Sequence, residues 1–141
     1  GVMGVVASDE QPLLGLLSMI LPCIASGNRV VAVPSLKAAL IVADFYQLLD
    51  TSDVPGGVIN LVTGVPSELA KVLAAHDDVA AIWAVGPAVE CEQIKKESAG
   101  NLKSVWTSDG KSPDWYDSQA EGSSWLERAT QVKNIWVPYG E

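Results

Sequence analysis

The stretch that decides the fold reads GNRVVAVPS at residues 27–35 and PGGVINLVTG at residues 55–64. Each piece holds a short run dominated by valine and isoleucine, with glycine beside it and little alternation between polar and apolar residues. Continuous apolar runs bounded by turn residues are typical of strands that are covered on both faces. The two pieces therefore predict strands in the interior of a parallel sheet.

The rest of the chain alternates similar apolar runs with helical patterns. We expect strands near residues 1–7, 29–33, 57–62, 79–85 and 102–107, and helices at 12–25, 35–49, 67–75 and 88–98. This alternation predicts an α/β fold of three layers, in which a parallel sheet of about five strands carries helices on both faces.

Three details of these helices are predicted as well. In 35–49, Lys37, Asp44 and Gln47 recur at spacings that give one narrow exposed stripe on an otherwise buried helix. Ser67 is expected to cap the helix that runs to Ala75. In 88–98, the side chains of Glu92 and Lys96 are expected to pair.

Composition limits the function classes. A chain of 141 residues with 48% hydrophobic residues is long enough for one domain with a core. The net charge of −8 argues against nucleic acid and anionic membrane as partners, because both would repel the protein. The apolar run 12–25 is short for a membrane span and contains Pro22.

Two cysteines, Cys23 and Cys91, suggest a reducing compartment, so we expect a cytoplasmic protein. Gly1 begins abruptly in a strand-like run, which suggests a piece of a longer protein.

The composition changes after Thr107. Residues 108–124 are rich in Ser, Asp, Gly and Pro and predict a polar loop or tether, while 125–141 predict a helical turn followed by a strand at about 131–138. Four of the five tryptophans stand in or beside this part of the chain: Trp106, Trp115, Trp125 and Trp136. Either they fold back and seal an edge of the sheet, or they mark a contact with another chain or domain. For the second case the expected contact residues are Trp125, Val132, Ile135, Trp136 and Val137.

Six short motifs follow one another along the chain: GVMG at 1–4, PLL at 12–14, ASGN at 25–28, PGGVIN at 55–60, HDDV at 76–79 and GKSP at 110–113. Together they resemble the nucleotide-binding half of the aldehyde dehydrogenases, over roughly residues 1–113. Residues 129–137 resemble the C-terminal oligomerisation strand of that family. The nearest likeness is to the degenerate second module of the family-16 aldehyde dehydrogenases. The resemblance implies a Rossmann-like domain at 1–107 and, in the parent family, NAD as cofactor.

The resemblance also implies that the family's chemistry is missing. The family inserts a catalytic domain with a nucleophilic cysteine where this chain has only a short segment, and no cysteine follows Cys91. Glu10 stands where the family has its oxyanion-binding asparagine, and Ser108 falls near the general-base glutamate. A carboxylate repels a developing oxyanion, and a serine does not accept a proton usefully near neutral pH. We therefore predict no catalytic residue in this chain.

Cofactor binding looks equally damaged by the same comparison. Val33 and Leu36 stand where a lysine and a glutamate would hold the adenosine ribose, and Pro87 replaces the serine of a Gly-Ser pair at the pyrophosphate site. We expect a degenerate crevice near Val33, Ser35, Leu36, Gly86 and Pro87, with no bound cofactor. We expect no metal either, because His76 is the only histidine and has no ligand partner at suitable spacing.

Three hypotheses remain open from the sequence. The chain is a non-catalytic module of a longer protein that assembles through its last strand, with the same parent chain or with a sister subunit. Alternatively, it is part of an NAD-dependent aldehyde dehydrogenase whose catalytic residues lie elsewhere in the parent chain. As a third possibility, the old cofactor crevice binds a ligand other than NAD, either apolar or without an adenine.

Overall fold

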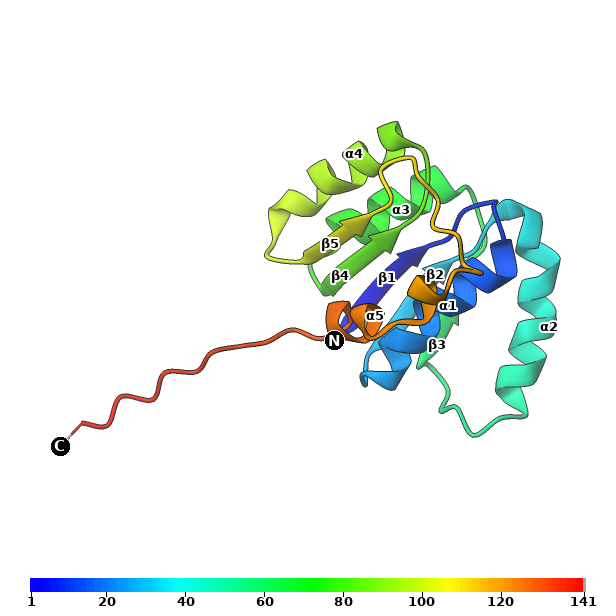
Figure 1. The fold of residues 1–141 in the computed structure, drawn as a ribbon. Coiled ribbons are helices and arrows are strands. Elements are labelled where there is room, and N and C mark those ends of the chain that lie inside the picture. Colours follow the sequence, from blue (N-terminus) through cyan, green and yellow to red (C-terminus); the bar gives the residue numbers. More distant parts are fainter. Residues whose placement is uncertain (141) are drawn as a thin grey trace.

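A computed structural model describes residues 1–140. Five parallel strands form one sheet in the order β3-β2-β1-β4-β5, and helices cover both of its faces (Figure 1). The elements in chain order are β1 (Val2–Val6), α1 (Pro12–Ala25), β2 (Arg29–Val33), η1 (Leu36–Ala38), α2 (Ala39–Asp50), β3 (Ile59–Leu61), α3 (Pro66–Ala75), β4 (Val79–Ala84), α4 (Ala88–Glu97), η2 (Ser98–Gly100), β5 (Ser104–Thr107), η3 (Ser118–Glu121) and α5 (Ser123–Arg128). The predicted three-layer α/β fold with about five parallel strands is confirmed.

The core lies on both faces of the sheet. On one face, α1 packs Leu16, Met19, Ile20 and Cys23 against alternate residues of the strands. On the other face, α3 and α4 supply a smaller cluster around Ala70, Ala74 and Ile94. The inner strands are buried on both faces, which explains why their sequences are continuously apolar.

Helix α2 corrects one expectation. Only Val42 of α2 is fully buried, and Leu40 and Leu48 are 87% and 65% exposed. The helix lies beside the short edge strand β3, so it reaches the core with one stripe, to which Phe45 and Leu49 also belong. The expectation of a single narrow exposed stripe on a buried helix was wrong, because no described element covers the outer side of α2.

The start of α3 is a second correction. The helix begins at Pro66 with Val65 as its N-cap, and no side chain caps it by a hydrogen bond. Ser67 therefore lies inside the first turn and is not the predicted cap. Proline serves well at the first helical position, because the N–H that it lacks would have no partner within the helix.

Residues 113–129 fold back over the sheet face that carries α1. Trp115 and Trp125 are 3% and 7% exposed, and the ring of Trp125 lies 5.2 Å from that of Trp83 and 4.9 Å from that of Trp106. The segment 108–124 thus packs as a loop and does not hang as a tether. For Trp115 and Trp125, the alternative in which tryptophans seal the sheet is the one that the structure has.

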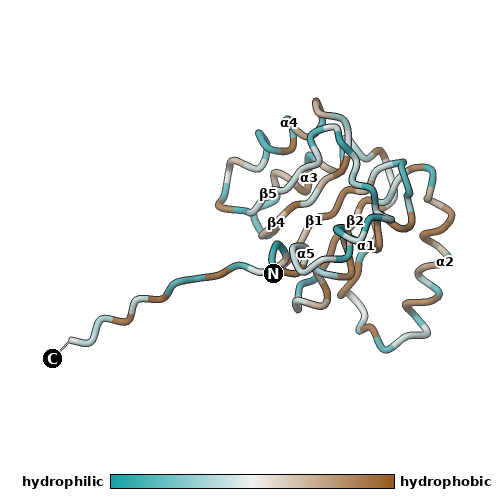
Figure 2. Tube along the Cα trace, in the orientation of Figure 1, coloured by the Kyte–Doolittle hydropathy of each residue, from teal (hydrophilic) through white to brown (hydrophobic). Residues whose placement is uncertain are grey.

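Residues 130–140, here called the tail, leave the domain as an extended segment that forms no strand within the chain (Figure 1). Apolar residues recur along it (Figure 2), and Trp136 is 92% exposed. The predicted strand 131–138 is therefore not paired with any described residue of its own chain. A strand needs a neighbour for its backbone hydrogen bonds, and the tail lies beside none in the described chain. None of the helices between residues 1 and 140 is long and apolar enough to cross a membrane.

Candidate functional site

The candidate site is a cleft of about 550 Å³ at the carboxyl ends of β1 and β4. The chain crosses from β1 toward β2 in one direction and later from β3 back to β4 on the other side of β1. The loops that follow β1 and β4 therefore diverge and leave a crevice between them. In open parallel sheets, ligands bind at such a switch point.

The cleft carries negative charge. Asp9 and Glu10 enter it from the loop after β1, and Glu90 enters it from the first turn of α4, whereas its described lining contains neither lysine nor arginine. The nearest basic partner is Lys37, whose Nζ lies 3.6 Å from Oδ2 of Asp9. Glu10 and Glu90 have no basic partner among the described ion pairs, and such carboxylates repel anions, so the cleft disfavours phosphate groups.

The amino end of α4 borders this cleft, at the place where a helix would offer backbone N–H groups to a phosphate. Pro87 is the N-cap of α4 and has no N–H to donate. The Glu90 carboxylate stands in the first turn, where negative charge is already favourable to the helix dipole. A Cβ on Gly110 would lie 3.3 Å from the amide nitrogen of Ala88, so the loop after β5 presses against the helix start.

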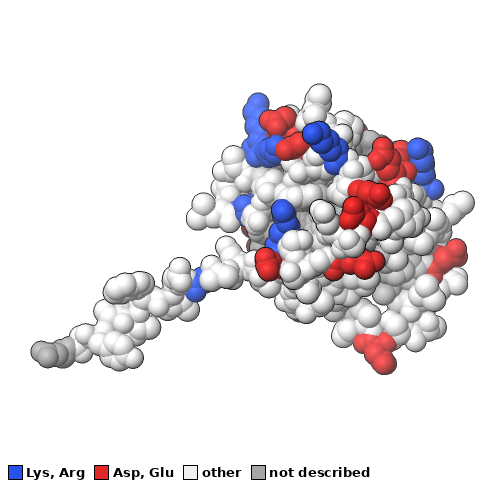
Figure 3. Space-filling model, viewed as in Figure 1, with Lys and Arg blue, Asp and Glu red and all other residues white. Residues whose placement is uncertain are grey.

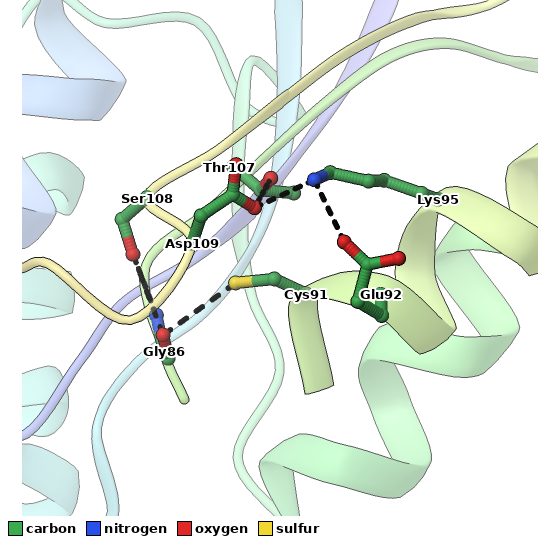
Figure 4. Close-up of polar contacts among 7 residues, drawn as sticks. All are labelled: Gly86, Cys91, Glu92, Lys95, Thr107, Ser108 and Asp109. Atoms are coloured by element: carbon green, nitrogen blue, oxygen red, sulfur yellow. Dashed lines mark hydrogen bonds and ion pairs between the residues drawn. The ribbon is translucent and has the colours of Figure 1, made fainter. Parts of the chain in front are cut away.

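Hydrogen bonds hold this loop in place (Figure 4). The amide of Gly110 donates to the carbonyl of Gly86 at 3.2 Å, and the amide of Gly86 donates to Oγ of Ser108 at 3.2 Å. Left-handed backbone at Asp109 (φ 50°) and Gly110 (φ 82°) makes the turn sharp enough for these contacts. The loop is therefore fixed to the end of β4 and to the start of α4.

Lys95 of α4 fastens the same loop from outside (Figure 4). Its Nζ lies 2.7 Å from Oδ1 of Asp109 and 3.1 Å from Oε1 of Glu92. The hydrogen bond to Asp109, then the one to Glu92, raises the pKa of Lys95. The hydrogen bond from Lys95 in turn holds the pKa of Asp109 below its ordinary value. The predicted partner of Glu92 was Lys96; the structure pairs Glu92 with Lys95 instead.

The predicted crevice residues divide into two groups. Leu36, Gly86 and Pro87 line the cleft. Ser35 is 1% exposed and does not line it; its Oγ donates to Oδ1 of Asp9 and accepts from the amide of Lys37. Val33 is 1% exposed and belongs to the core, so only three of the five face the cleft.

The structure also locates the residues that the family resemblance relates to catalysis. Glu10 is exposed in the cleft, and Ser108 uses its hydroxyl to hold Gly86. Cys91 is fully buried, and its Sγ donates to the carbonyl of Gly86 at 3.5 Å (Figure 4). Cys23 is buried in α1, and burial raises the pKa of its thiol to about 12. Neither thiol of the described chain lines the cleft, so the arrangement offers no cysteine nucleophile there.

Metal binding has no support from side-chain geometry. Within residues 1–140, no three His, Cys, Asp or Glu side chains are grouped so that they could hold an ion. Nδ1 of His76 accepts a hydrogen bond from the amide of Asp78, which fixes the ring at the end of α3.

The predicted contact residues lie in two places. Trp125 is buried in the core and packs against residues of its own domain. This corrects the expectation that Trp125 contacts another chain. Val132, Ile135, Trp136 and Val137 lie in the tail, and each is at least 66% exposed. Figure 3 shows the tail as a largely uncharged surface with one basic side chain, and Lys133 is its one charged residue between 130 and 140.

Some contacts that shape the site could not be read from the sequence. The pairs Lys95–Asp109 and Asp9–Lys37 join residues 14 and 28 positions apart, and no periodicity connects them. Asp109-Gly110 was the one available signal, because this dipeptide favours the left-handed backbone that the loop adopts.

Known proteins are similar to this chain in both sequence and structure. The sequence pattern described as "Aldehyde dehydrogenase family" matches residues 1–130. The 2-aminomuconic semialdehyde dehydrogenase of Mus musculus is 35% identical over 105 residues, which cover 74% of this chain and 22% of that protein.

Two solved structures show the same relation. A mutant aldehyde dehydrogenase C from Pseudomonas syringae, in complex with NAD+ and octanal, is 31% identical with a TM-score of 0.72. The gamma-glutamyl-gamma-aminobutyraldehyde dehydrogenase of Burkholderia cenocepacia is 35% identical with a TM-score of 0.71. Each match covers 76% of this chain and 22% of the solved chain. This chain thus spans about a fifth of the length of these similar proteins.

Proposed function

Since this chain belongs to the aldehyde dehydrogenase family, we propose that it is a non-catalytic module of that family that supports assembly of a longer protein. The observation that carries the proposal is the chemistry at the start of α4. Pro87 offers no N–H there and the Glu90 carboxylate adds negative charge, beside the cleft where a dinucleotide's pyrophosphate would bind.

Family membership confirms the resemblance that the ordered motifs predicted. The finer likeness, to the second module of the family-16 enzymes, stays a prediction. So does the division into a degenerate nucleotide-binding domain at 1–107, a connecting segment at 108–124 and an assembly segment at 125–141.

Electrostatics and donor count both oppose binding of NAD. A pyrophosphate is an anion, and the described cleft lining presents Asp9, Glu10 and Glu90 without a basic residue. The proline at the helix N-cap removes one donor from the start of α4. Each lost or unpaired polar contact costs about 1–3 kcal/mol, so a few together weaken binding by orders of magnitude.

Catalysis by this chain lacks an accessible cysteine nucleophile. Aldehyde oxidation through a thioester needs a thiolate that can reach the aldehyde carbon. Cys23 and Cys91 are both buried away from the cleft, and the raised pKa of Cys23 keeps its thiol protonated near neutral pH. We also propose a cytoplasmic location, because both cysteines are free and buried.

The tail supports the assembly role. Tail residues Val132, Ile135, Trp136, Val137 and Tyr139 expose 66% to 100% of their surfaces, although large apolar side chains gain free energy when they leave water. A concentrated set of exposed apolar residues marks an interaction surface.

The binding part of the proposal is tested by calorimetric titration of the chain with NAD+ and NADP+. We expect absent or millimolar binding. Micromolar binding of either dinucleotide would contradict the proposal.

The assembly part is tested by light scattering on the chain with and without residues 131–141. The deletion starts after Thr130, because the Thr130 amide and hydroxyl both donate to the Glu127 carbonyl and finish α5. We expect the truncated chain to keep its circular dichroism spectrum and lose association. Unchanged association would count against the assembly role.

A second candidate is favoured by the coverage of the relatives. Because the chain spans about 22% of their length, it is alternatively part of an NAD-dependent aldehyde dehydrogenase whose catalytic residues lie elsewhere in the parent chain. Comparison of aldehyde oxidation by the parent protein and by a parent that lacks this segment separates the two. A parent that loses turnover but not assembly would favour the second candidate.

A further inference from the structure

We propose that residues 131–137 of one copy of this chain add as a further strand to the outer edge of β5 in a second copy. The inference rests on the proposed assembly role and names both the acceptor surface and the partner.

The outer edge of β5 has free backbone groups. The amide of Ser108 donates to the carbonyl of Ala84, so the peptide groups of 104, 106 and 108 point toward β4. Peptide groups alternate along a strand, and those of Val105 and Thr107 therefore point away from the sheet. Among residues 1–140 no segment pairs with that side of β5. An open edge of this kind is a template for another strand.

The opposite edge of the sheet is short and blocked at its carboxyl end. On β3, the Tyr46 hydroxyl accepts from the amide of Leu61 at 2.6 Å and donates to the carbonyl of Leu61 at 3.2 Å. Leu61 is the outward-facing peptide group at the carboxyl end of that short strand, because its neighbour Val62 donates to Ala32 of β2. Tyr46 thus occupies the outward hydrogen-bonding groups of Leu61, one of only two outward peptide groups in this three-residue strand, so β5 is the better acceptor.

The tail has the properties of the missing strand. Val132, Ile135, Trp136 and Val137 are exposed apolar residues in an extended segment without intrachain partners among the described residues. Its root is fixed, because the side-chain amide of Asn28 donates to the carbonyl of Ala129 at 2.8 Å. From there the tail runs away from its own sheet (Figure 1), so a second copy is the acceptor that we infer.

The side chains of the two segments match by face. On β5, Trp106 packs with the aromatic cluster on the α1 face, and Val105 packs with the cluster on the α3 and α4 face. In the tail, Trp136 alternates with Ile135 and Val137. With Trp136 placed on the face of Trp106, Ile135 and Val137 fall on the face of Val105, and aromatic and aliphatic pairs form across the strands.

If each copy adds its tail to β5 of the other, the result is a closed dimer. Each copy carries one free tail and one free β5 edge, so a twofold dimer satisfies both sets of backbone groups with the same contact used twice. Such a dimer does not leave an open tail or edge from which a filament would grow.

Hydrogen exchange of the full-length chain tests the proposal directly. At concentrations where light scattering finds a dimer, we expect slow exchange at the amides of Val105 and Thr107, and fast exchange on dilution or on removal of residues 131–141. Fast exchange at both amides in the dimer would overturn the proposal. Slow exchange at Val105 in a monomer would also overturn it, because the tail would then pair within its own chain. A chain that stays monomeric up to its solubility limit would overturn it as well.

A pair of variants tests the acceptor edge separately from the tail. Val105→Pro removes an outward amide without removing a bond to β4, and we expect it to weaken the dimer about tenfold or more. Val105→Thr keeps the amide and should dimerise as the natural chain does. If the tail deletion abolishes association but Val105→Pro, shown to be folded, does not weaken it, the assembly role stands and β5 is not the acceptor. If Val105→Pro does not fold, the exchange pattern of the natural chain decides.

Discussion

The indole nitrogen of Trp115 lies 2.7 Å from the point where a Cβ on Gly15 would stand. Gly15 is a buried residue of α1, and Trp115 belongs to the segment that follows β5. The absent side chain in the helix is therefore what allows the returning segment to seal the sheet face. This contact joins residues a hundred positions apart and makes residues 113–129 part of the domain.

Replacement of Gly15 by alanine should lower the free energy of unfolding. Alanine favours the helix by about 1 kcal/mol, but overpacking against the indole costs about 1–3 kcal/mol, and the second effect should win. Urea unfolding of Gly15→Ala measures the net change. Gly100→Ala is the control, because a Cβ on Gly100 meets nothing within 4 Å. A stabilised Gly15→Ala would show that Trp115 does not pack here.

Trp125→Ala should destabilise the domain by about 3–5 kcal/mol, because Trp125 contacts three other tryptophan rings in the core. Trp136→Ala is the matched comparison, since Trp136 is 92% exposed. It should leave the urea midpoint unchanged and weaken only the association measured by light scattering. Equal loss of stability in both variants would contradict the separate roles of core and tail.

Lys95→Gln should loosen the loop that presses on α4. Amide exchange at Gly110 is expected to speed up in this variant, whereas Lys96→Gln, which removes an adjacent lysine of α4, should leave it unchanged. High salt should reduce the difference, because both partners are at the surface. Identical exchange in the two variants would argue that backbone bonds alone hold the loop.

The Lys95–Asp109 ion pair should make the stability of the loop fall at both low and high pH. Asp109 has a lowered pKa in the folded state, so its contribution to stability is present above the unfolded pKa and is lost as pH falls through the folded value. Lys95 has a raised pKa, so its contribution is present below its ordinary value of 10.5 and is lost as pH rises through the folded value. Gly110 exchange, corrected for the intrinsic rate at each pH, should therefore be slowest between the two limits. Asp109→Asn should remove the acidic limit.

Cys23 should make the fold less stable at high pH. Burial raises the pKa of its thiol from an ordinary value of 9.0 to about 12, so above pH 9 the unfolded chain loses a proton that the folded chain keeps. The free energy of unfolding should then fall by about 1.4 kcal/mol per pH unit from this group. Cys23→Ala should remove that slope in urea titrations between pH 9 and 11. An unchanged slope would mean that other groups cause it.

The sequence by itself determined the strands, the helices and their alternation. Runs of valine and isoleucine bury the strands on both faces, and the order of strand and helix follows from these local patterns. The same local signals predicted the ends of α1.

Only the tertiary structure decided which surfaces are covered. A pattern of apolar residues in α2 cannot tell how many neighbours the helix will have, and its place beside the edge strand leaves Leu40 and Leu48 exposed. Trp125 and Trp136 are both tryptophans near the C-terminal end of the sequence, yet Trp125 is buried in the core and Trp136 is exposed in the tail. Burial depends on contacts between distant residues, such as Gly15 with Trp115 and Tyr46 with Leu61, and these contacts exist only once the sheet has brought their elements together.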